Sequence, residues 1–490
     1  MSFITADRKQ IDLIGYSLDD FVEKDSKARF VVDIVEKLNT KEIEESYSAQ
    51  GGEAYDPKIM LAIWFFSYSE SETSTRKIEN NCKKNMDYIY VSANLRPDHS
   101  TLSRFRKRHL EVLGKYFVEI IRIAQKKGLS EFKEIAIDGS KIRSASSKKK
   151  SMKEETISRY IKAIEKDIDN YLQEVEKEED LGELEKLKIK KEKLEGAKEK
   201  LQERKKDIKK DNRGSHQVNI EEADAYMMET AGRVSFPGYN AQLSVDTKTQ
   251  LIVAAEVVQD RNDEKQFSRQ HKKVEENLGQ SVDREYVADG GYKSLEQLEY
   301  IAENKIEAYL RSSSKQRTKE EILKTRKKIT RGDFKYDKDK DSYICPAGKE
   351  LKLYRIENNI FFKGKKYRTK QCTGCELLKL CLANNNKKGH REIRRDNREI
   401  YAEMMNQKMQ TEQAKKILFR RRTTVEPVIG NIKSNMGNNR FRLKGLNNVN
   451  GEFYLMCIGH NINKLYNLLV FIFLLCTTSK NPKYDYIVLN

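Results

Sequence analysis

Residues 134–140 read Glu-Ile-Ala-Ile-Asp-Gly-Ser, an apolar run that ends in an acidic residue followed by glycine. The run predicts a buried strand whose C-terminal end presents the carboxylate of Asp138. Residues 284–291, Arg-Glu-Tyr-Val-Ala-Asp-Gly-Gly, repeat the pattern and place Asp289 after a second predicted strand. A carboxylate that follows an apolar strand is costly to bury alone, so both aspartates need a partner.

Further strand patterns lie around these two stretches. Tyr239–Val245 and Leu251–Val258 are separated by a polar turn and predict a β-hairpin. A helix over Ser294–Asn304 and a strand over Ile306–Leu310 are predicted after the second aspartate. The sequence therefore predicts an α/β fold with a mixed five-stranded sheet and flanking helices, assembled from residues 131–147 and 214–311.

The segment 148–213 interrupts this domain. It holds 21 Lys or Arg and 18 Asp or Glu in 66 positions, so its charges nearly cancel. Apolar residues recur at helical steps over Ile157–Val175 and every seven residues over Leu187–Ile208. With residues 181–183 (Leu-Gly-Glu) as the reversal, the pattern predicts an inserted antiparallel helical hairpin. Because its charges cancel, we expect this hairpin to be a spacer or a dimer arm rather than the main surface for binding a polyanion such as DNA.

Residues 1–130 are predicted to be helical throughout. Three short helices within Thr75–Leu110, the last of them basic, suggest a helix-turn-helix. The last helix carries Arg104 and Arg106, which are candidates for DNA contact. A basic helix face that is only solvated explains the same residues, and that alternative stays open.

The two aspartates are candidates for a metal site. If they end neighbouring strands, Asp138 and Asp289 repel each other unless a cation lies between them. Hard divalent cations with oxygen ligands, Mg²⁺ above all, meet that demand. A turn made by each Asp-Gly pair is the competing interpretation.

A third carboxylate stands in a strongly basic segment. Glu426 is the single acidic residue of Lys415–Lys444, which carries nine basic residues. A carboxylate in such a setting is suited to hold a metal while its neighbours bind phosphates. On a helix, Arg422 and Glu426 share a face and Lys433 lies two turns further on, while Pro427 is expected to bend or begin that helix. A plain Arg–Glu surface pair is the alternative.

These stretches resemble the bacterial insertion-sequence DDE transposases with an RNase H-like catalytic core, and the resemblance covers roughly residues 50–466. The third carboxylate resembles the centre of their Tyr-Arg-Glu-Lys signature, although the signature's Tyr falls at Phe419. The similar stretches, in chain order, are Pro97–Arg106, Ile137–Ser140, Ala288–Tyr292, Arg422 to Lys433, Asn439–Arg442 and Gly459–Ile462.

The resemblance implies a D-D-E site of Asp138, Asp289 and Glu426 that binds two Mg²⁺ or Mn²⁺ ions. One metal would activate water or a DNA 3′-hydroxyl, and the other would stabilise the leaving oxygen. Residues 401–466 would supply the catalytic C-terminal helices, followed by a tail at 467–490. The basic residues expected to contact DNA are Arg104, Arg106, Arg422, Lys433, Arg440 and Arg442.

A Lys-rich and Cys-rich insertion is predicted at 312–400. Its cysteines are Cys345, Cys372, Cys375 and Cys381, of which the middle two form a C-x2-C pair. Four thiolates suit a structural Zn²⁺ in a zinc ribbon. Reduced thiols and a disulfide are the alternatives.

The composition of the chain indicates the kind of partner that the protein binds and the cellular compartment in which it acts. The 95 basic and 76 acidic residues leave a net charge of +19, which indicates a polyanionic partner such as double-stranded DNA. No run reaches the 18 apolar residues that a membrane span needs, no phosphate-binding P-loop is present, and the seven cysteines suit a reducing compartment. We therefore expect no membrane, no nucleotide cofactor and a cytoplasmic, nucleoid-associated location in bacteria.

The main hypothesis is a transposase that cleaves DNA at insertion-sequence ends and joins it to target DNA, in a metal-dependent reaction. Terminal inverted repeats and target DNA would be its partners, and it would act as a homodimer or a larger assembly. Two alternatives remain: a DDE nuclease that cuts without strand transfer, and a non-catalytic DNA-binding regulator derived from a transposase.

Overall fold

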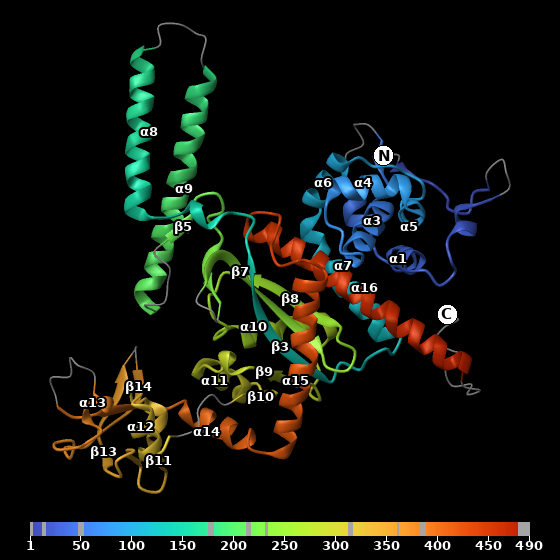
Figure 1. Ribbon diagram of the computed structural model, residues 1–490. Helices are drawn as coiled ribbons and strands as arrows, with labels where there is room; N and C mark the ends of the chain where they lie inside the picture. Colours follow the sequence, from blue (N-terminus) through green and yellow to red (C-terminus); the bar gives the residue numbers. More distant parts are fainter. Residues whose placement is uncertain are drawn as a thin grey trace. The chain divides into compact units, whose positions relative to one another are not determined.

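A computed structural model gives the structure of the protein (Figure 1). The chain divides into two compact units, the first made of Met1–Val287 with Phe419–Asn490 and the second of Ala288–Leu418. The residues that the structure describes are 3–11, 16–47, 53–174, 181–211, 217–230, 234–311, 317–359, 362–382 and 389–478.

The first unit begins with a helical region. Its centre is α3 (Pro57–Ser69), which starts at a proline after the cap residue Asp56 and buries all its residues except Lys58. The three short helices predicted near residue 100 are present. The elements of this region are β1 (Phe3–Ile4), α1 (Lys27–Glu36), α2 (Lys41–Glu45), β2 (Ala54–Tyr55), α4 (Thr75–Lys84), α5 (Met86–Val91), α6 (His99–Arg108) and α7 (Leu113–Lys126).

A sheet forms the core of the rest of the first unit. In it β9 (Glu285–Ala288) neighbours β3 (Glu134–Arg143), and β3 pairs antiparallel with β7 (Ser235–Asp246). The other edge of β7 pairs with β6 (Tyr226–Glu229) and then with β8 (Ile252–Val258), the predicted hairpin partner. The sequence missed β6 but was right that the sheet is assembled across the insertion.

Helices cover this sheet. α10 (Gln266–Leu278) packs on β7 and β8, and α16 (Leu446–Thr478) packs on α3, α7 and β8 (Figure 1). The side chain of Asn461 on α16 bonds both the amide and the carbonyl of Ile252, at 2.8 Å each, and so satisfies buried backbone groups of β8. The helix extends to Thr478 and thus into the segment that the sequence assigned to a tail. No helix in the described ranges combines the length and apolar character that crossing a bilayer requires.

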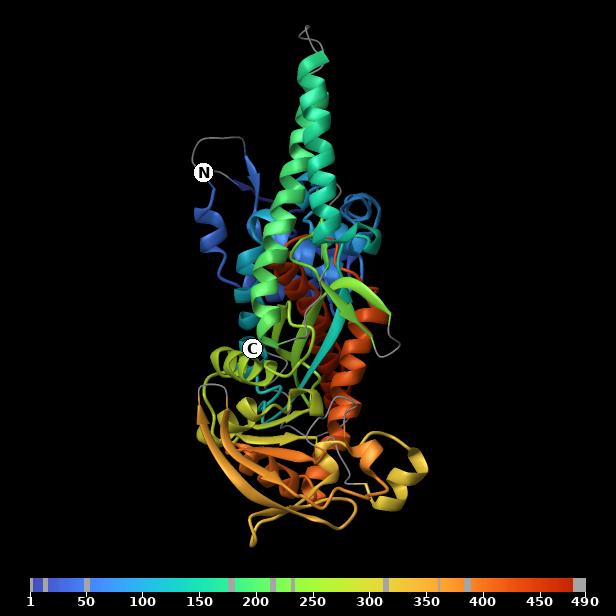
Figure 2. The same cartoon turned by 90° about the vertical axis from the view of Figure 1, so that its left-hand side faces the viewer.

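The charged insertion forms the predicted antiparallel hairpin. α8 (Glu154–Glu174) and α9 (Leu181–Asp211) run side by side (Figures 1 and 2), and ion pairs join Lys205 to Glu154 and Lys191 to Glu165. Leu181-Gly182-Glu183 is the first turn of α9 and not the reversal. Helix propensity in the charged run outweighs the single glycine there. The links at 175–180 and the side chain of Ile208 lie outside the described residues.

The second unit contains a five-stranded antiparallel meander, which lies within the predicted insertion at 312–400. Each strand pairs with the next along the chain. The unit itself is wider than the predicted insertion. Its elements are α11 (Leu295–Glu303), β10 (Glu307–Leu310), α12 (Lys319–Thr325), β11 (Lys335–Asp337), β12 (Ser342–Ile344), β13 (Glu350–Asn359), β14 (Phe362–Arg368), α13 (Leu378–Cys381), β15 (Glu392–Asp396) and α14 (Glu399–Lys408). From there α15 (Glu412–Gly430) leads the chain back into the first unit.

Candidate active site

An arginine that the sequence analysis did not single out links two of the predicted site residues. One terminal nitrogen of Arg421 lies 2.9 Å from Oδ2 of Asp138, and the other lies 4.0 Å from Oε1 of Glu426. The Arg421 side chain is 8% exposed, compared with 19% for Asp138 and 59% for Glu426. Arg421 therefore neutralises a carboxylate on β3 and lies within ion-pair reach of one on α15, two elements far apart in the sequence.

The third nitrogen of this guanidinium, Nε, makes no hydrogen bond to a described residue. Nε of Arg421 is buried and has no hydrogen-bond partner among the described residues. A buried donor left unpaired costs about 1–3 kcal/mol. The site thus keeps the capacity for one more acceptor beside Asp138.

Asp138 lies in the middle of β3 and not at its C-terminal end, so the predicted strand end is wrong. The ladder with β7 continues past it, pairing Gly139 with Gln242 and Arg143 with Gly238. A Cβ at position 139 would lie 2.2 Å from Nε2 of Gln242, so any larger residue there would have to displace this buried side chain. The Asp-Gly pair marks a close approach within the sheet and not a turn.

Lys433 contacts β3 on the face to which Asp138 points. It lies in a π-helical turn, Asn431–Asn435, and its Nζ donates to Oγ of Ser140 at 3.0 Å and to the carbonyl of Lys141 at 3.3 Å. Because side chains alternate along a strand, Ser140 and Asp138 point to one side of the sheet. Burial lowers the pKa of Lys433 from its ordinary value. A second cation thus lies on the face of β3 to which Asp138 points.

Arg422 and Glu426 lie on one helix, as the sequence predicts, but the alternative of a surface ion pair between them is not borne out. Arg422 and Glu426 are both exposed, and no ion pair joins them in the described part of the chain. The buried face of α15 repeats at steps of three and four residues and contains Arg421, Thr424, Val425 and Val428. Arg422 lies one position outside that face and turns to solvent.

Pro427 and Phe419 both lie within α15. Pro427 lies inside the helix, which continues to Gly430 and does not begin or end at the proline. A proline leaves the carbonyl four residues earlier without its helical donor, and Gln250 Nε2 lies 3.5 Å from that carbonyl, of Thr423. Phe419, at the signature's Tyr position, is 68% exposed.

Asp289 directly follows β9, as the sequence predicts, and precedes a 3₁₀ turn at Gly290–Tyr292. It is the second residue of the second unit. The strand before it, β9, is the neighbour of β3 in the sheet. The structure therefore brings Asp138 and Glu426 of the first unit together around Arg421, whereas Asp289 belongs to the second unit.

Arg440 and Arg442 have structural contacts near the end of β3. Arg440 donates to the carbonyls of Ser144 and Ser146, at 2.9 and 3.1 Å. The backbone amide of Arg442 donates to the buried carboxylate of Glu452 at 3.0 Å, while its side chain is exposed. Burial raises the pKa of Glu452. Both arginines remain exposed, although the guanidinium of Arg440 is held by these two carbonyls.

A buried polar cluster lies behind β3 that the sequence analysis missed. Oδ1 of Asp263 accepts from Asn240 at 2.8 Å and Gln242 at 2.7 Å, and Lys141 lies 3.4 Å away. Asn240 and Gln242 are fully buried. Since Gly139 and Lys141 alternate with Asp138, the cluster lies on the opposite face of the sheet from Arg421. Its hydrogen bonds fix the strands that position the carboxylate.

On α6 the two arginines proposed for DNA contact differ. Arg104 is exposed and donates within its own helix to Thr101 at 3.3 Å. Arg106 is buried, with its guanidinium 4.6 Å from the Trp64 ring centre, and it donates to the Tyr68 hydroxyl at 3.4 Å. Arg106 stabilises the helical core and is not available to phosphates, so that prediction is wrong.

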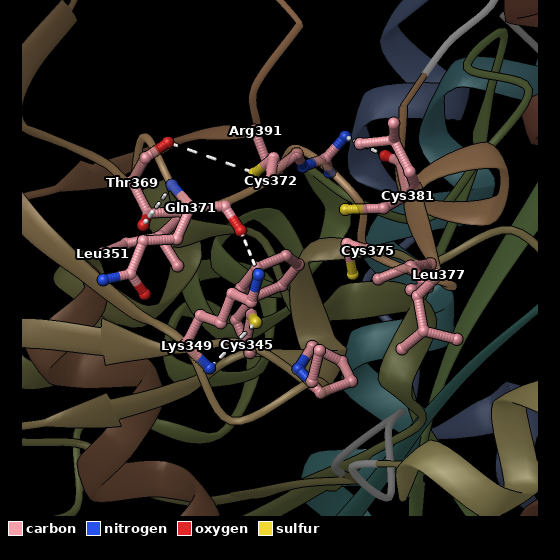
Figure 3. A pocket seen from close by; sticks show the side chains of 15 residues that line it. Cys345, Lys349, Leu351, Thr369, Gln371, Cys372, Cys375, Leu377, Cys381 and Arg391 are labelled. Carbon is pink, nitrogen blue, oxygen red and sulfur yellow. Dashed lines mark hydrogen bonds between the residues drawn. The ribbon is translucent and has the colours of Figure 1, made fainter.

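The four cysteines of the second unit line one pocket, shown in Figure 3. All four are free thiols, and they come from two turns and the end of α13. Burial, with the neighbouring cysteines, raises the pKa of the Cys381 thiol to about 11. The sequence predicted this set, but the spacing alone did not bring Cys345 to the other three.

The oxygen ligands of the carboxylate site suit a hard divalent metal ion. Carboxylate oxygens such as those of Asp138 and Glu426 are the ligands that Mg²⁺ and Mn²⁺ take in proteins. Over the described residues, no group of three or more His, Cys, Asp or Glu side chains has the geometry of a formed metal site. In the structure Arg421 supplies the positive charge between Asp138 and Glu426.

Comparison with protein families gives two matches. A family model for a transposase DDE domain matches residues 344–466, and a family model for a transposase domain, DUF772, matches residues 16–108. The first match includes Glu426 and the four cysteines, and the second covers α1 to α6, while Asp138 and Asp289 lie outside both. A search of curated proteins gave no match. With a mixed α/β fold and a basic chain, these two matches support a transposase of the DDE type.

Proposed function

We propose that the protein is a transposase that cleaves DNA at the ends of an insertion sequence and joins those ends to target DNA. The observation that carries the proposal is the contact of Arg421 with Asp138 and Glu426. Two carboxylates from separate elements that approach one buried cation supply oxygen ligands of the kind that a divalent metal takes.

Asp138, Asp289 and Glu426 would hold one or two Mg²⁺ or Mn²⁺ ions in this proposal. When bound, such ions activate a nucleophilic oxygen and stabilise the leaving oxygen at phosphorus. Before a metal binds, a residue of the chain itself would compensate the charge of these carboxylates. Arg421 holds the carboxylates of β3 and α15 near each other, so their repulsion is balanced before a metal arrives.

Phosphate binding would fall to the cations beside the carboxylates. Arg421 keeps an unpaired buried Nε, and the amine of Lys433 lies on the same face of β3 as Asp138. A scissile phosphate brought to Asp138 would offer both groups an acceptor. Exposed Arg422 and Arg442 would add sequence-independent phosphate contacts around them.

Recognition of the DNA ends would involve the helical region. The net charge of +19 suits a long polyanion, and Arg104 is an exposed cation on α6. The hairpin of α8 and α9 would serve as a spacer or a dimer arm in a homodimer or a larger assembly on DNA. The protein would act where the bacterial DNA lies, in the cytoplasm.

The test uses DNA duplexes made from the sequences that flank the coding region. Labelled duplexes are incubated with the full-length protein and Mg²⁺, and cleaved and joined products are separated on a gel. A transposase gives both cleaved ends and strand-transfer products. Cleavage without joining would instead support a DDE nuclease, and binding with neither product a regulator.

A further inference from the structure

The second unit contains a candidate metal site that is separate from the carboxylates. Cys345 follows β12, Cys372 and Cys375 lie in the turn after β14, and Cys381 ends α13. All four line the pocket that we call the cysteine pocket, and Figure 3 shows their sulfur atoms around it. Residues from two turns and one helix end thus meet at one place.

The backbone around Cys345 is shaped to present its sulfur. The Cys345 amide donates to the Lys349 carbonyl at 2.9 Å, and the Lys349 amide returns a hydrogen bond to Sγ of Cys345 at 3.3 Å. Gly348 takes a φ of 73° in this turn, a conformation that side-chain-bearing residues rarely adopt.

The C-x2-C pair lies in a similar tight turn. The Cys375 amide donates to the Cys372 carbonyl at 3.2 Å, and Gly374 between them has a φ of 70°. The turn brings two sulfur ligands that are three residues apart to one pocket, as in structural zinc sites.

A positive charge accompanies the thiols. Arg391 lines the cysteine pocket and donates to the Cys381 carbonyl at 3.2 Å. Its Nε is buried without a hydrogen-bond partner among the described residues. Four thiolates around a divalent ion carry a net charge of −2, and a neighbouring guanidinium offsets part of it.

The apolar core beside the pocket is small. Three of the cysteines, Cys345, Cys375 and Cys381, pack against it. A domain with a core of this size commonly needs a cross-link such as a metal ion. The buried residues of the core are Ile322, Ile329, Phe334, Tyr343, Leu351, Tyr367, Leu377 and Ile393.

We propose that Cys345, Cys372, Cys375 and Cys381 bind one structural Zn²⁺ as thiolates, which ties the turns of the meander together. The thiols release their protons to solvent when the metal binds. The sulfur atoms do not yet have the geometry of a formed site. Rotation about χ1 of a cysteine moves its sulfur without moving the backbone.

The first measurement is the metal content of the full-length protein, purified with a reductant and without added metal. We expect about one zinc ion per chain by elemental mass spectrometry. Cys372→Ser and Cys381→Ser should each lose most of the zinc. Cys82→Ala, which removes a buried thiol of α4 in the first unit, is the matched control and should retain it.

A second measurement uses the wild-type protein, so it tests the proposal even if the serine variants do not fold. Wild-type protein is stripped with a chelator and loaded with Co²⁺, and we expect the absorption bands of tetrahedral cobalt bound to thiolates. Zinc should raise the unfolding temperature of the stripped protein. A wild-type protein without zinc and without these bands, or one that holds a disulfide between these cysteines, would overturn the proposal. Zinc content unchanged in both serine variants would also overturn it.

Discussion

At the scale of single residues, the site depends on an arginine at a position where the helix presents its buried face. Arg421 follows Ile417 by one turn and precedes Val425 and Val428 on the same face of α15. An arginine buried at such a position needs a carboxylate, and Asp138 provides it at 2.9 Å. The burial pattern of the helix was readable in the sequence and would have identified Arg421 instead of Arg422.

Replacing Arg421 with glutamine should destabilise the metal-free protein. The change leaves the partly buried Asp138 without its counterion, and we expect a loss of about 1–3 kcal/mol in the free energy of unfolding, below the full cost of breaking a wholly buried pair. Added Mg²⁺ should restore more stability to this variant than to the wild type. Urea unfolding with and without Mg²⁺ measures both effects.

Arg422→Gln is the matched control for this variant, because the residue is adjacent and exposed. Its unfolding free energy should stay within about 0.5 kcal/mol of the wild type. Equal losses in the two variants would mean that the contact between Arg421 and Asp138 does not stabilise the protein.

At the scale of elements, α16 connects the helical region to the sheet through buried polar groups. His460 lies on this helix, its Nε2 donates to the Gln250 carbonyl at 3.0 Å, and its Nδ1 accepts from Asn431 at 3.0 Å. The carbonyl can only accept, so Nε2 carries the proton of a neutral imidazole. Burial lowers the pKa of His460 to about 4.

The stability of the protein should therefore fall as the pH drops from about 6.5 to 4. In this window the unfolded state binds a proton at this histidine that the folded state does not, so acid favours unfolding. The shift corresponds to about 3 kcal/mol, lost progressively towards pH 4. Urea unfolding of His460→Gln between these pH values should show a shallower decline than the wild type. Parallel curves for the two proteins would assign the acid sensitivity to other groups.

The helix α6 allows a direct separation of DNA binding from folding. Arg104→Gln should weaken DNA binding and reduce its dependence on salt, because a phosphate contact displaces counterions. Arg106→Gln should leave that salt dependence unchanged but lower stability by about 1–2 kcal/mol, since it loses the Trp64 ring. Binding isotherms at several salt concentrations and urea unfolding measure the two effects. An unchanged salt slope in Arg104→Gln would show that this helix face is only solvated.

Hydrophobic periodicity predicted most of these elements, and it failed where a tertiary contact decides the local structure. The helices near residue 100, the hairpin of β7 and β8, and the long helical insertion all follow their patterns. β3 runs past Asp138 because β7 pairs with it over its whole length. α15 continues through Pro427, where a side chain from another segment lies near the freed carbonyl. A pattern within one segment cannot show such a partner.

At the scale of the whole molecule, the candidate site is assembled from segments that an insertion and a second unit separate in the sequence. Asp138 precedes the hairpin of α8 and α9, and Glu426 comes after the second unit. The order of the motifs predicted that these segments meet. The sequence could not show that a cation already lies between two of the carboxylates, because that contact depends on how α15 faces β3.

Catalysis at this site and binding to DNA should be separable in one variant. Glu426→Gln keeps the size of the side chain but removes a negative charge beside the proposed phosphate position. The variant should bind end DNA at least as tightly as the wild type. Glu412→Gln, at an exposed position of the same helix, is the matched control and should keep both functions.

The most direct test is Mg²⁺-dependent cleavage of labelled end DNA, measured beside a gel shift on the same preparation of Glu426→Gln. If Glu426 is a metal ligand, end binding persists while cleavage and joining fall by at least about a hundredfold, as expected when a catalytic metal loses a ligand. Cleavage at the wild-type rate by the glutamine variant would contradict the D-D-E site, and with it the proposed transposase activity.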